Sequence, residues 1–207
     1  MNANLNVLPI DALRVVGDPK DFIFQKDFSL SPQDCAGLIS LFEKSSADYY
    51  TAEMIGKDKA ESYNYIRSTN CFISRGDRPE WAIWDQILFA KLRDALDELS
   101  VILPVGMELI GSFEDTGYQI QRSSPGDFCQ WHTDGQSETS GSRFMICIWH
   151  LNSNFEGGEL EFMYQDVSYK PRAGTLTICP ATWTHVHQVK EVTEGERYAI
   201  ITWLEHK

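Results

Sequence analysis

The 207-residue sequence has no apolar run near the roughly 18 residues that a membrane-spanning helix needs, so we expect no membrane partner. Basic residues are scarce: 18 Lys and Arg stand against 30 Asp and Glu, which gives a formal charge of -12. Phosphate backbones bind to basic faces, and this balance therefore argues against a nucleic-acid partner. The opening residues MNANLNVLPIDALRVVGDPK lack a basic segment followed by an apolar stretch, and we expect no secretory signal.

Cysteine is also sparse: the five cysteines are scattered and form no CxxC pair. An odd number without paired spacing argues against a disulfide framework and favours a reducing cytoplasm. The sequence contains no internal repeat and no low-complexity segment. Its hydrophobic share of 43% and charged share of 23% are those of an ordinary globular protein. We expect one domain over residues 1–207, and the sequence leaves the oligomeric state open.

The first half of the chain alternates predicted helices with shorter strands. DFIFQKDF (21–28) predicts a strand, and a helix with one apolar face begins after Ser31, a residue type that caps helices. A second helix begins near Pro79 and ends before Pro104. The segment 51–78 between the helices is polar apart from the strand-like YIRSTNCFI. A connection of this length predicts a functional lid.

The second half, from about residue 117, consists of short β-rich runs separated by turn signals. They are GYQIQRS, DFCQWHTD, RFMICIWHL, GELEFMY, GTLTICPA, HVHQV and ERYAIITWL. Strands at this spacing predict a sandwich or barrel, and a double-sheet jelly roll with helices outside it is the natural candidate. We therefore expect an α+β fold, with helical support and a lid over about 1–105 and a jelly-roll catalytic core over about 106–207.

The segment CQWHTDG (129–135) places His132 and Asp134 two positions apart in an otherwise uncharged run. On a strand, both side chains would point the same way. An imidazole and a carboxylate that converge on one point suit a divalent transition metal. The alternative interpretation is a surface turn closed by Asp134 and Gly135, with His132 solvated.

The segment PATWTHVHQVKEVTEGERYAIITW (180–203) offers a third ligand and an anion clamp. Either His185 or His187 could complete a set of two imidazoles and one carboxylate on one side of an iron, which leaves room for a chelating cosubstrate and dioxygen. Arg197 could grip a carboxylate through two parallel hydrogen bonds. A lone arginine is more often a surface residue, but this one begins a strand whose alternate residues look inward-facing. They are Ala199, Ile201 and Trp203.

From about residue 117 to 204 the chain resembles the 2-oxoglutarate- and iron(II)-dependent dioxygenases, in particular their prolyl 4-hydroxylase-like branch. Tyr118 to Asp134 resembles the family's strand, Pro-Gly turn and His-x-Asp motif. CIWHLNSNFEGGELEF resembles its aromatic-Leu-Asn strand followed by Gly-Gly-Glu-Leu. HQVKEVTEGER is similar to its distal histidine followed, ten residues on, by an arginine for the cosubstrate's far carboxylate. The resemblance implies a double-stranded β-helix, or jelly-roll, core.

The resemblance also implies which residues form the site. His132, Asp134 and His187 are the expected catalytic iron ligands, because the family spacing fits His187 and not His185. Arg197 is the expected 2-oxoglutarate clamp. His185 is then expected to be a hydrogen-bonded histidine near the outer shell of the metal.

Two tyrosines that are frequent in the family are absent from this chain. The one before Leu-Asn is His150 here, and we expect this imidazole to help Arg197 hold the cosubstrate. The one before the Pro-Gly turn is replaced in the region of Ser123, and we assign its role to Gln121. Strand parity then turns three apolar residues inward together with His150. They are Phe144, Ile146 and Ile148.

The resemblance implies hydroxylation of a C–H bond, most of all in a prolyl residue of a peptide or protein, with release of succinate and CO2. Its cofactors would be Fe(II), 2-oxoglutarate and O2, with ascorbate as a candidate reductant. The carboxylate of Asp134 favours hydroxylation, since halogenating relatives lack it. The tyrosine-rich lid segment could cover an extended substrate chain.

Two alternatives stay open. A free amino acid or another small molecule could be the substrate of the same chemistry. The domain could also be a non-redox metal-binding module, with zinc in the same triad. Arg197 discriminates against the module, because simple metal binding needs no carboxylate clamp ten residues beyond a ligand.

Overall fold

The first long helix begins where the sequence supplies a capping box. The Ser31 hydroxyl accepts a hydrogen bond from the backbone N–H of Asp34, and the Asp34 carboxylate accepts one from the backbone N–H of Ser31. Helix α1 (Pro32–Lys44) then buries Cys35, Leu38 and Phe42 along one face. The predicted start and apolar face of this helix are confirmed.

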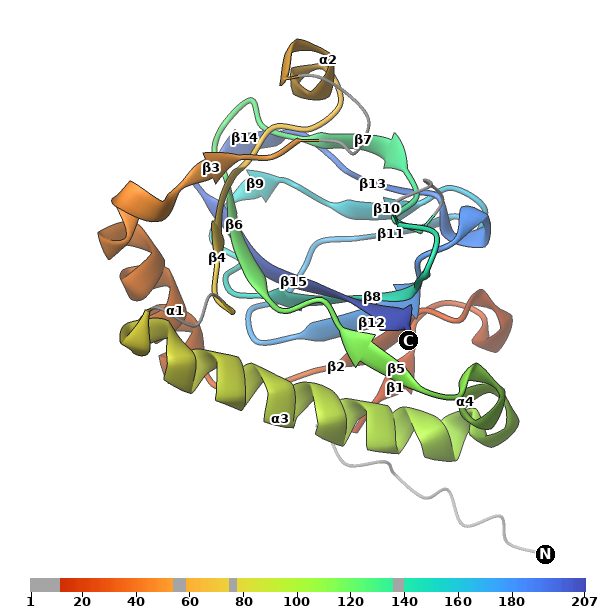
Figure 1. Cartoon of the computed structure of the whole chain (residues 1–207). Helices are drawn as coiled ribbons and strands as arrows, with labels where there is room; N and C mark the ends of the chain where they lie inside the picture. The colour runs from red at the N-terminus through yellow and green to blue at the C-terminus, as the bar shows by residue number, and fades with distance from the viewer. Residues whose placement is uncertain (1–11, 54–58, 75–77, 136–139) are drawn as a thin grey trace, which may run out of the picture.

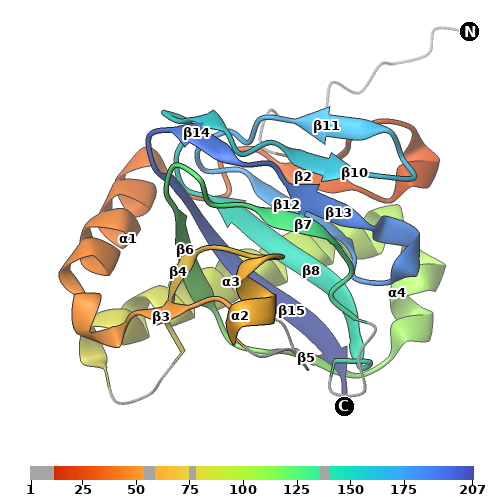
Figure 2. The same cartoon turned by 90° about the horizontal axis from the view of Figure 1, so that it is seen from above.

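The computed structural model describes residues 12–53, 59–74, 78–135 and 140–207 and combines helices with antiparallel sheets, as expected for the α+β class. Two sheets lie face to face, and α1 and α3 (Pro79–Ile102) cover the outer face of the larger one (Figures 1 and 2). Among the described helices, none is long and apolar enough to cross a membrane. The remaining helical segments are α2 (Lys59–Tyr63), α4 (Pro104–Ile110), η1 (Pro19–Asp21), η2 (Ser46–Asp48) and η3 (Trp183–His185).

The larger sheet runs in the order β1-β2-β12-β8-β15-β6-β4-β3, with β5 paired to β15. Its strands are β1 (Arg14–Val15), β2 (Phe24–Lys26), β3 (Tyr50–Thr51), β4 (Thr69–Phe72), β5 (Phe113–Asp115), β6 (Gln119–Ser123), β8 (Arg143–His150), β12 (Leu176–Pro180) and β15 (Arg197–His206). Four of these strands come from the first half of the chain, so the expected boundary near residue 105 does not separate a helical part from a β part.

The smaller sheet runs in the order β11-β10-β13-β7, and a separate pair joins β14 to β9. These strands are β7 (Cys129–His132), β9 (Glu156–Gly157), β10 (Leu160–Phe162), β11 (Val167–Tyr169), β13 (His187–Val189) and β14 (Val192–Glu194). Figure 2 shows this sheet stacked over β8, β12 and β15. The faces that the two sheets turn toward each other, here called the inner faces, carry the candidate site.

Strand alternation divides the core into two clusters. On β15, Tyr198 and Ile200 pack toward the helices, whereas Ala199, Ile201 and Trp203 pack between the sheets. The inner cluster gathers buried residues from both sheets. They are Ile23, Ile146, Ile148, Leu160, Phe162, Cys179 and Ala199. The predicted inward faces of β15 and of Ile146 and Ile148 on β8 are confirmed.

Phe144 was predicted to face inward, and this prediction is wrong. Leu204 opposes Met145 while the next residue of β15 opposes Arg143, so Phe144 occupies a bulge in β8. Its ring packs in the cluster between the larger sheet and the helices, here called the outer cluster. There it stands edge-on to Phe113, with ring centres 5.5 Å apart. A bulge changes the parity on which the prediction relied.

The predicted lid segment lies along the edge of the smaller sheet. Ile66 forms a β-bridge with Cys129, and the backbone N–H of Arg67 donates to the Phe128 carbonyl at 2.8 Å. The Arg67 guanidinium also lies over the rings of Tyr63 and Phe128, 4.1 and 4.7 Å from their centres. Figure 1 shows α2 above β7. This part of the segment is therefore held by backbone and side-chain contacts beside the strand that carries His132.

The strand predicted within YIRSTNCFI is confirmed as β4. Two other parts of the predicted lid, 54–58 and 75–77, lie outside the described residues.

Candidate metal centre and anion site

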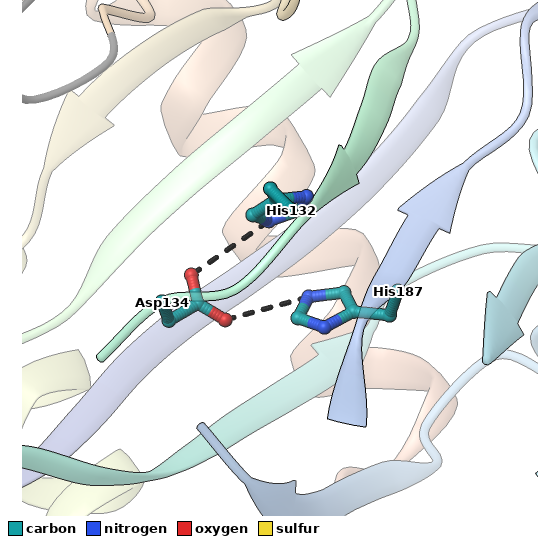
Figure 3. A group of neighbouring side chains, drawn as sticks. All are labelled: His132, Asp134 and His187. Carbon is teal, nitrogen blue, oxygen red and sulfur yellow. Dashed lines mark ion pairs between the residues drawn. The ribbon is translucent and has the colours of Figure 1, made fainter. Parts of the chain in front are cut away.

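Three side chains converge between the sheets, two from neighbouring strands and one from the turn that follows the first of them. His132 ends β7 and lies directly opposite His187, the first residue of β13, in the antiparallel register. Asp134 follows two residues after His132 and reaches both rings. Its Oδ1 lies 3.8 Å from Nε2 of His132, and its Oδ2 lies 3.4 Å from Nε2 of His187 (Figure 3). One ligand atom from each residue lies within 4.8 Å of the others, so the three could hold a metal ion.

The chain turns sharply after Asp134 and leaves no space for a larger residue at the next position. The backbone N–H groups of Asp134 and Gly135 both donate to the Ala181 carbonyl, at 3.1 and 2.9 Å. A Cβ on Gly135 would lie 2.3 Å from the Arg143 carbonyl oxygen. The Asp134 side chain is only 8% exposed. The alternative of a solvated surface turn at Asp134 and Gly135 therefore does not describe this segment.

Backbone carbonyls orient both imidazoles. Nδ1 of His132 lies 2.8 Å from the Gln130 carbonyl, and Nδ1 of His187 lies 2.9 Å from the His185 carbonyl. A carbonyl only accepts hydrogen bonds, so each Nδ1 carries a proton and each ring turns its Nε2 toward Asp134. Burial alone would lower the pKa of His132, but Cys129, Asp134 and the Gln130 carbonyl raise it to about 10. Burial, followed by the neighbouring His132, lowers the pKa of His187 to about 4, and its ring is neutral at pH 7.

The donor set fits a cation. The two Nε2 atoms and the Asp134 carboxylate face one another, and a metal ion can take the place of the proton that His132 carries beside the carboxylate. Among the described residues, Asp134 Oδ2 is buried and has no hydrogen-bond partner. Two imidazole nitrogens and a carboxylate on one side suit iron(II), with positions left open for other ligands.

His185 lies outside this group. Its Nδ1 is 2.9 Å from the Thr184 hydroxyl, and its Nε2 is 2.7 Å from the Asp21 carbonyl, so both ring nitrogens have partners. The ring links η3 to η1. The structure thus brings His187, and not His185, to the other two residues, in agreement with the family spacing.

Arg197 supplies the second charged group of the inner face. It begins β15, is 3% exposed, and makes no ion pair with any carboxylate that the structure describes. Its Nε is buried and has no hydrogen-bond partner in the part of the chain that the structure describes. Burial lowers the pKa of its guanidinium to about 10, so it remains charged at pH 7. A buried charge without a counter-ion is costly, and the site is therefore suited to an anionic ligand.

The Gly-Gly pair of the sequence makes room for this arginine. A Cβ on Gly158 would lie 2.9 Å from the Phe155 ring and 3.0 Å from Cδ of Arg197. Both glycines also have positive φ, +72° at Gly157 and +65° at Gly158, where other residues are strained. The motif thus has a local cause, since only glycine lets the chain pass over the arginine stem.

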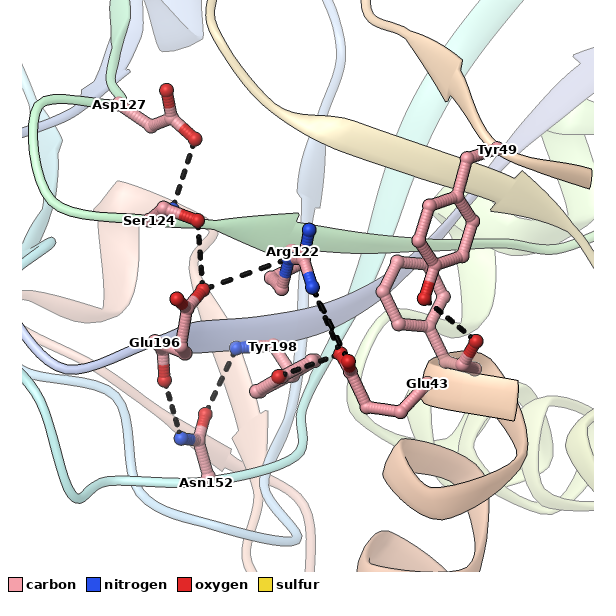
Figure 4. A network of polar contacts seen from close by, with 9 residues as sticks. Glu43, Tyr49, Arg122, Ser124, Asp127, Asn152, Glu196 and Tyr198 are labelled. Atoms are coloured by element: carbon pink, nitrogen blue, oxygen red, sulfur yellow. Dashed lines mark hydrogen bonds and ion pairs between the residues drawn. The ribbon is translucent and has the colours of Figure 1, made fainter. Parts of the chain in front are cut away.

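The residues next to Arg197 hold the start of β15 from the opposite face. The Tyr198 hydroxyl donates to the Glu43 carboxylate at 2.8 Å, and Arg122 lies 3.2 Å from Glu43 and 3.6 Å from Glu196. Glu196 also accepts from the Ser124 hydroxyl at 2.8 Å (Figure 4). This network ties β15 to β6 and α1. The neighbours of Arg197 point toward that network, whereas Arg197 itself faces the space between the sheets.

The two remaining predicted cosubstrate residues differ in their surroundings. His150 is buried opposite Ala199, and its Nε2 lies 3.1 Å from the Thr177 hydroxyl. Gln121 also opposes Ala199, on the neighbouring strand β6, and is half-buried. Burial, and then the charge of Arg197, lower the pKa of His150 well below its usual value, so this imidazole is neutral.

The sequence did not reveal three polar residues near these groups. Cys129 lies beside His132, with Sγ 3.4 Å from Nδ1. Tyr169 on β11 and Thr177 on β12 share a hydrogen bond of 2.9 Å. The contact between Tyr169 and Thr177 joins the two sheets, so alternation within each strand was the only signal for it in the sequence.

Comparisons with known proteins agree with this site. Residues 118–205 match the profile of the 2OG-Fe(II) oxygenase superfamily. A PKHD-type hydroxylase of Synechococcus sp. (strain CC9902) is 32% identical over 42% of this chain and 40% of its own length. A PKHD-type hydroxylase of Prochlorococcus marinus (strain MIT 9312) is 35% identical over 36% of this chain and 34% of its own length. The match thus spans well under half of these relatives.

Solved structures with low sequence identity share the fold over most of the chain. A viral collagen prolyl hydroxylase from Paramecium Bursaria Chlorella virus-1 in a 2OG complex has a TM-score of 0.66 at 18% identity, covering 90% of this chain and 97% of its own. A Pseudomonas putida prolyl-4-hydroxylase gives 0.66 at 20% identity, over 90% and 93%. A Trichoplax adhaerens prolyl hydroxylase in complex with a hypoxia inducible factor peptide fragment gives 0.72 at 16%, over 89% and 84%.

The local motif, the profile match and the shared fold point to one conclusion. The profile covers the segment that contains all three members of the triad and Arg197. The structural likeness extends to the helices and strands of the first half. Residues 118–205 are thus similar to the 2OG-Fe(II) oxygenase superfamily, and the chain as a whole shares the fold of solved prolyl hydroxylases.

Proposed function

We propose that this chain is a 2-oxoglutarate- and Fe(II)-dependent dioxygenase that hydroxylates a prolyl residue of a peptide or protein and releases succinate and CO2. The observation that carries the proposal is the presence of two charged groups between the sheets. Two imidazole nitrogens and the Asp134 carboxylate converge on one point, and the buried Arg197 guanidinium has no anion among the described residues. A metal chelated by a dicarboxylate satisfies both.

The chain's own residues would divide the work of binding. His132, Asp134 and His187 would hold iron(II) through the two Nε2 atoms and the carboxylate, and Arg197 would hold the far carboxylate of 2-oxoglutarate. Together with dioxygen, these groups supply the oxidative decarboxylation of 2-oxoglutarate coupled to insertion of one oxygen atom into a C–H bond. We infer that the facing sheets form the jelly roll expected from the sequence. Their apolar inner cluster would exclude water from the site.

The prolyl substrate is supported by the surface next to Asp134. The Arg143 guanidinium lies 4.1 Å from the centre of the Trp203 ring, and the charge of Asp134 acts on Arg143. Nε1 of Trp203 is buried without a partner in the described part of the chain. An indole with a spare N–H suits an amide whose ring is apolar, as a prolyl residue offers. The Trichoplax neighbour, a prolyl hydroxylase, is itself in complex with a peptide.

The test is succinate formation from 2-oxoglutarate with iron(II) against a panel of proline-containing peptides. Mass spectrometry should find one added oxygen on proline, and matched peptides with alanine in place of proline should remain unmodified. Free proline should be oxidised only weakly. Robust oxidation of a free amino acid without any modified peptide would instead establish the small-molecule alternative. Metal binding without succinate under any condition would indicate a non-redox module.

A further inference from the structure

Tyr169 reaches across from the smaller sheet to the charged residues of the larger one. It ends β11, opposite Leu160, and packs against the inner cluster. Its hydroxyl lies 2.9 Å from Oγ1 of Thr177, and its ring stands edge-on to His150 with ring centres 6.4 Å apart. His150 opposes Ala199, which lies two residues after Arg197 on the same face of β15. The Tyr169 hydroxyl therefore lies on the inner face beside the start of β15, where we assign the distal carboxylate to Arg197.

Three groups share the Thr177 hydroxyl, and its single proton limits how they can do so. Nε2 of Gln25 donates to Oγ1 at 3.4 Å, Nε2 of His150 lies at 3.1 Å and the Tyr169 hydroxyl at 2.9 Å. A hydroxyl donates once and accepts twice. Since Gln25 takes one acceptor position, either His150 or Tyr169 can donate to Thr177, and the other must receive the Thr177 proton.

The two arrangements differ in the proton that remains for a ligand. If Tyr169 donates to Thr177, its only proton is used, and a protonated Nδ1 of His150 is buried without a partner. If Nε2 of His150 donates instead, Thr177 donates to Tyr169, and the Tyr169 O–H stays available. Nδ1 of His150 has no partner among the described residues in either case. The second arrangement leaves the Tyr169 O–H free for an anion, whereas the first leaves only the Nδ1–H of His150.

We propose that the Tyr169 hydroxyl donates to the same carboxylate that pairs with Arg197, and that Thr177 and His150 are positioning residues behind it. This inference rests on the proposed 2-oxoglutarate dependence and revises the expectation that His150 touches the cosubstrate itself. His150 acts through Thr177. Burial raises the pKa of Tyr169, so the phenol keeps its proton and remains a donor over the whole working pH range.

Calorimetric binding to the full-length chain loaded with Mn(II), without oxygen chemistry, tests the proposal. The probes are 2-oxoglutarate and 2-oxobutanoate, which has the same metal-chelating end but no distal carboxylate. Tyr169→Phe should weaken 2-oxoglutarate about ten- to hundredfold, the range for a hydrogen bond to a charged group, and leave 2-oxobutanoate within twofold. Tyr164→Phe is the matched control, since Tyr164 is an exposed tyrosine of the same hairpin, and it should change neither affinity.

The positioning role of Thr177 has its own readout. Thr177→Val should weaken 2-oxoglutarate, whereas Thr177→Ser, which keeps the hydroxyl, should restore it. The double variant Thr177→Val with Tyr169→Phe should lose no more affinity for 2-oxoglutarate than Tyr169→Phe alone, because both changes remove the same contact. If the two losses of affinity add, the positioning role of Thr177 is overturned, since Thr177 would then have a contact of its own with the anion.

Other outcomes separate this inference from the proposed function. If Arg197→Leu weakens 2-oxoglutarate while Tyr169→Phe leaves it within twofold, or if Tyr169→Phe weakens both probes equally, the role of Tyr169 is overturned and the enzyme assignment stands. If the unaltered chain with Mn(II) binds no 2-oxoglutarate, both fall.

Discussion

At the scale of single residues, hydrogen bonding distinguishes the histidine that can bind metal from its neighbour two positions earlier. His187 keeps Nε2 bare and turned toward Asp134, while both ring nitrogens of His185 are engaged elsewhere. Spacing in the sequence and geometry in the structure therefore select the same residue for independent reasons. One depends on the distance to Arg197, and the other on which nitrogen carries a proton.

We expect His132→Ala and His187→Ala to lose iron and all iron-dependent turnover, because each removes one of three protein ligands. His185→Ala should keep most of both. Metal content and 2-oxoglutarate consumption of the three purified variants provide the measurement. Loss of iron in His185→Ala, with retention in His187→Ala, would reverse the assignment of the two histidines.

Arg197→Leu should weaken 2-oxoglutarate while leaving iron binding unchanged. Removing a charge-assisted pair inside the protein costs about 2–4 kcal/mol, which is roughly a 30- to 1000-fold loss of affinity. Titration of the variant with 2-oxoglutarate measures this loss, and total iron serves as the control. An affinity equal to that of the unaltered chain would place the anion site at a different residue.

At the scale of the elements, the turn between β9 and β10 controls the room available to the arginine. A Cβ on Gly158 meets both Phe155 and the stem of Arg197. We expect Gly158→Ala to displace the guanidinium and weaken 2-oxoglutarate at least tenfold, in addition to the strain of a positive φ. Gly126→Ala is the control, because Gly126 has φ +91° and nothing within 4 Å of the added Cβ. Equal affinities for the two variants would show that backbone strain alone is responsible.

The contacts between the predicted lid segment and the edge of the smaller sheet at β7 give a second prediction at this scale. Arg67 lies over Tyr63 and Phe128, and its backbone pairs with the strand that carries His132. Arg67→Ala should therefore raise the KM for a peptide substrate several-fold, while 2-oxoglutarate affinity stays within twofold. Arg93→Ala on the exposed face of α3 is the control. A change in 2-oxoglutarate affinity without one in peptide KM would exclude a role in covering the substrate.

At the scale of the whole molecule, the candidate site depends on pairings that cross both halves of the chain. The network of Glu43, Arg122 and Tyr198 ties a helix of the first half to the strand that begins with Arg197. Behind the inner face, α1 and α3 supply the outer cluster on which that strand rests. The helices thus position the site although none of the proposed ligand residues belongs to them.

The sequence predicted those parts of this arrangement that depend on local spacing. The triad and Arg197 were expected from the family motifs that two segments resemble, and the start of α1 follows from Ser31 and Asp34. Phe144 was misplaced, because a bulge depends on how β8 meets β15 and not on either strand alone. Tyr169 was missed for a related reason: its partner Thr177 lies on the opposite sheet, and only the folded chain brings the two together.

The position of the two histidines opposite each other on adjacent strands makes any bound metal a cross-link as well as a reaction centre. A cation held between His132 of β7 and His187 of β13 would cross-link the smaller sheet, and its removal would break that link. By mass action, metal at one hundred times its dissociation constant should add about 2.7 kcal/mol to the free energy of unfolding. Differential scanning calorimetry with and without a chelator measures this gain, and an unchanged melting temperature would contradict it. Iron supply would then set the lifetime of the folded protein together with its rate of turnover.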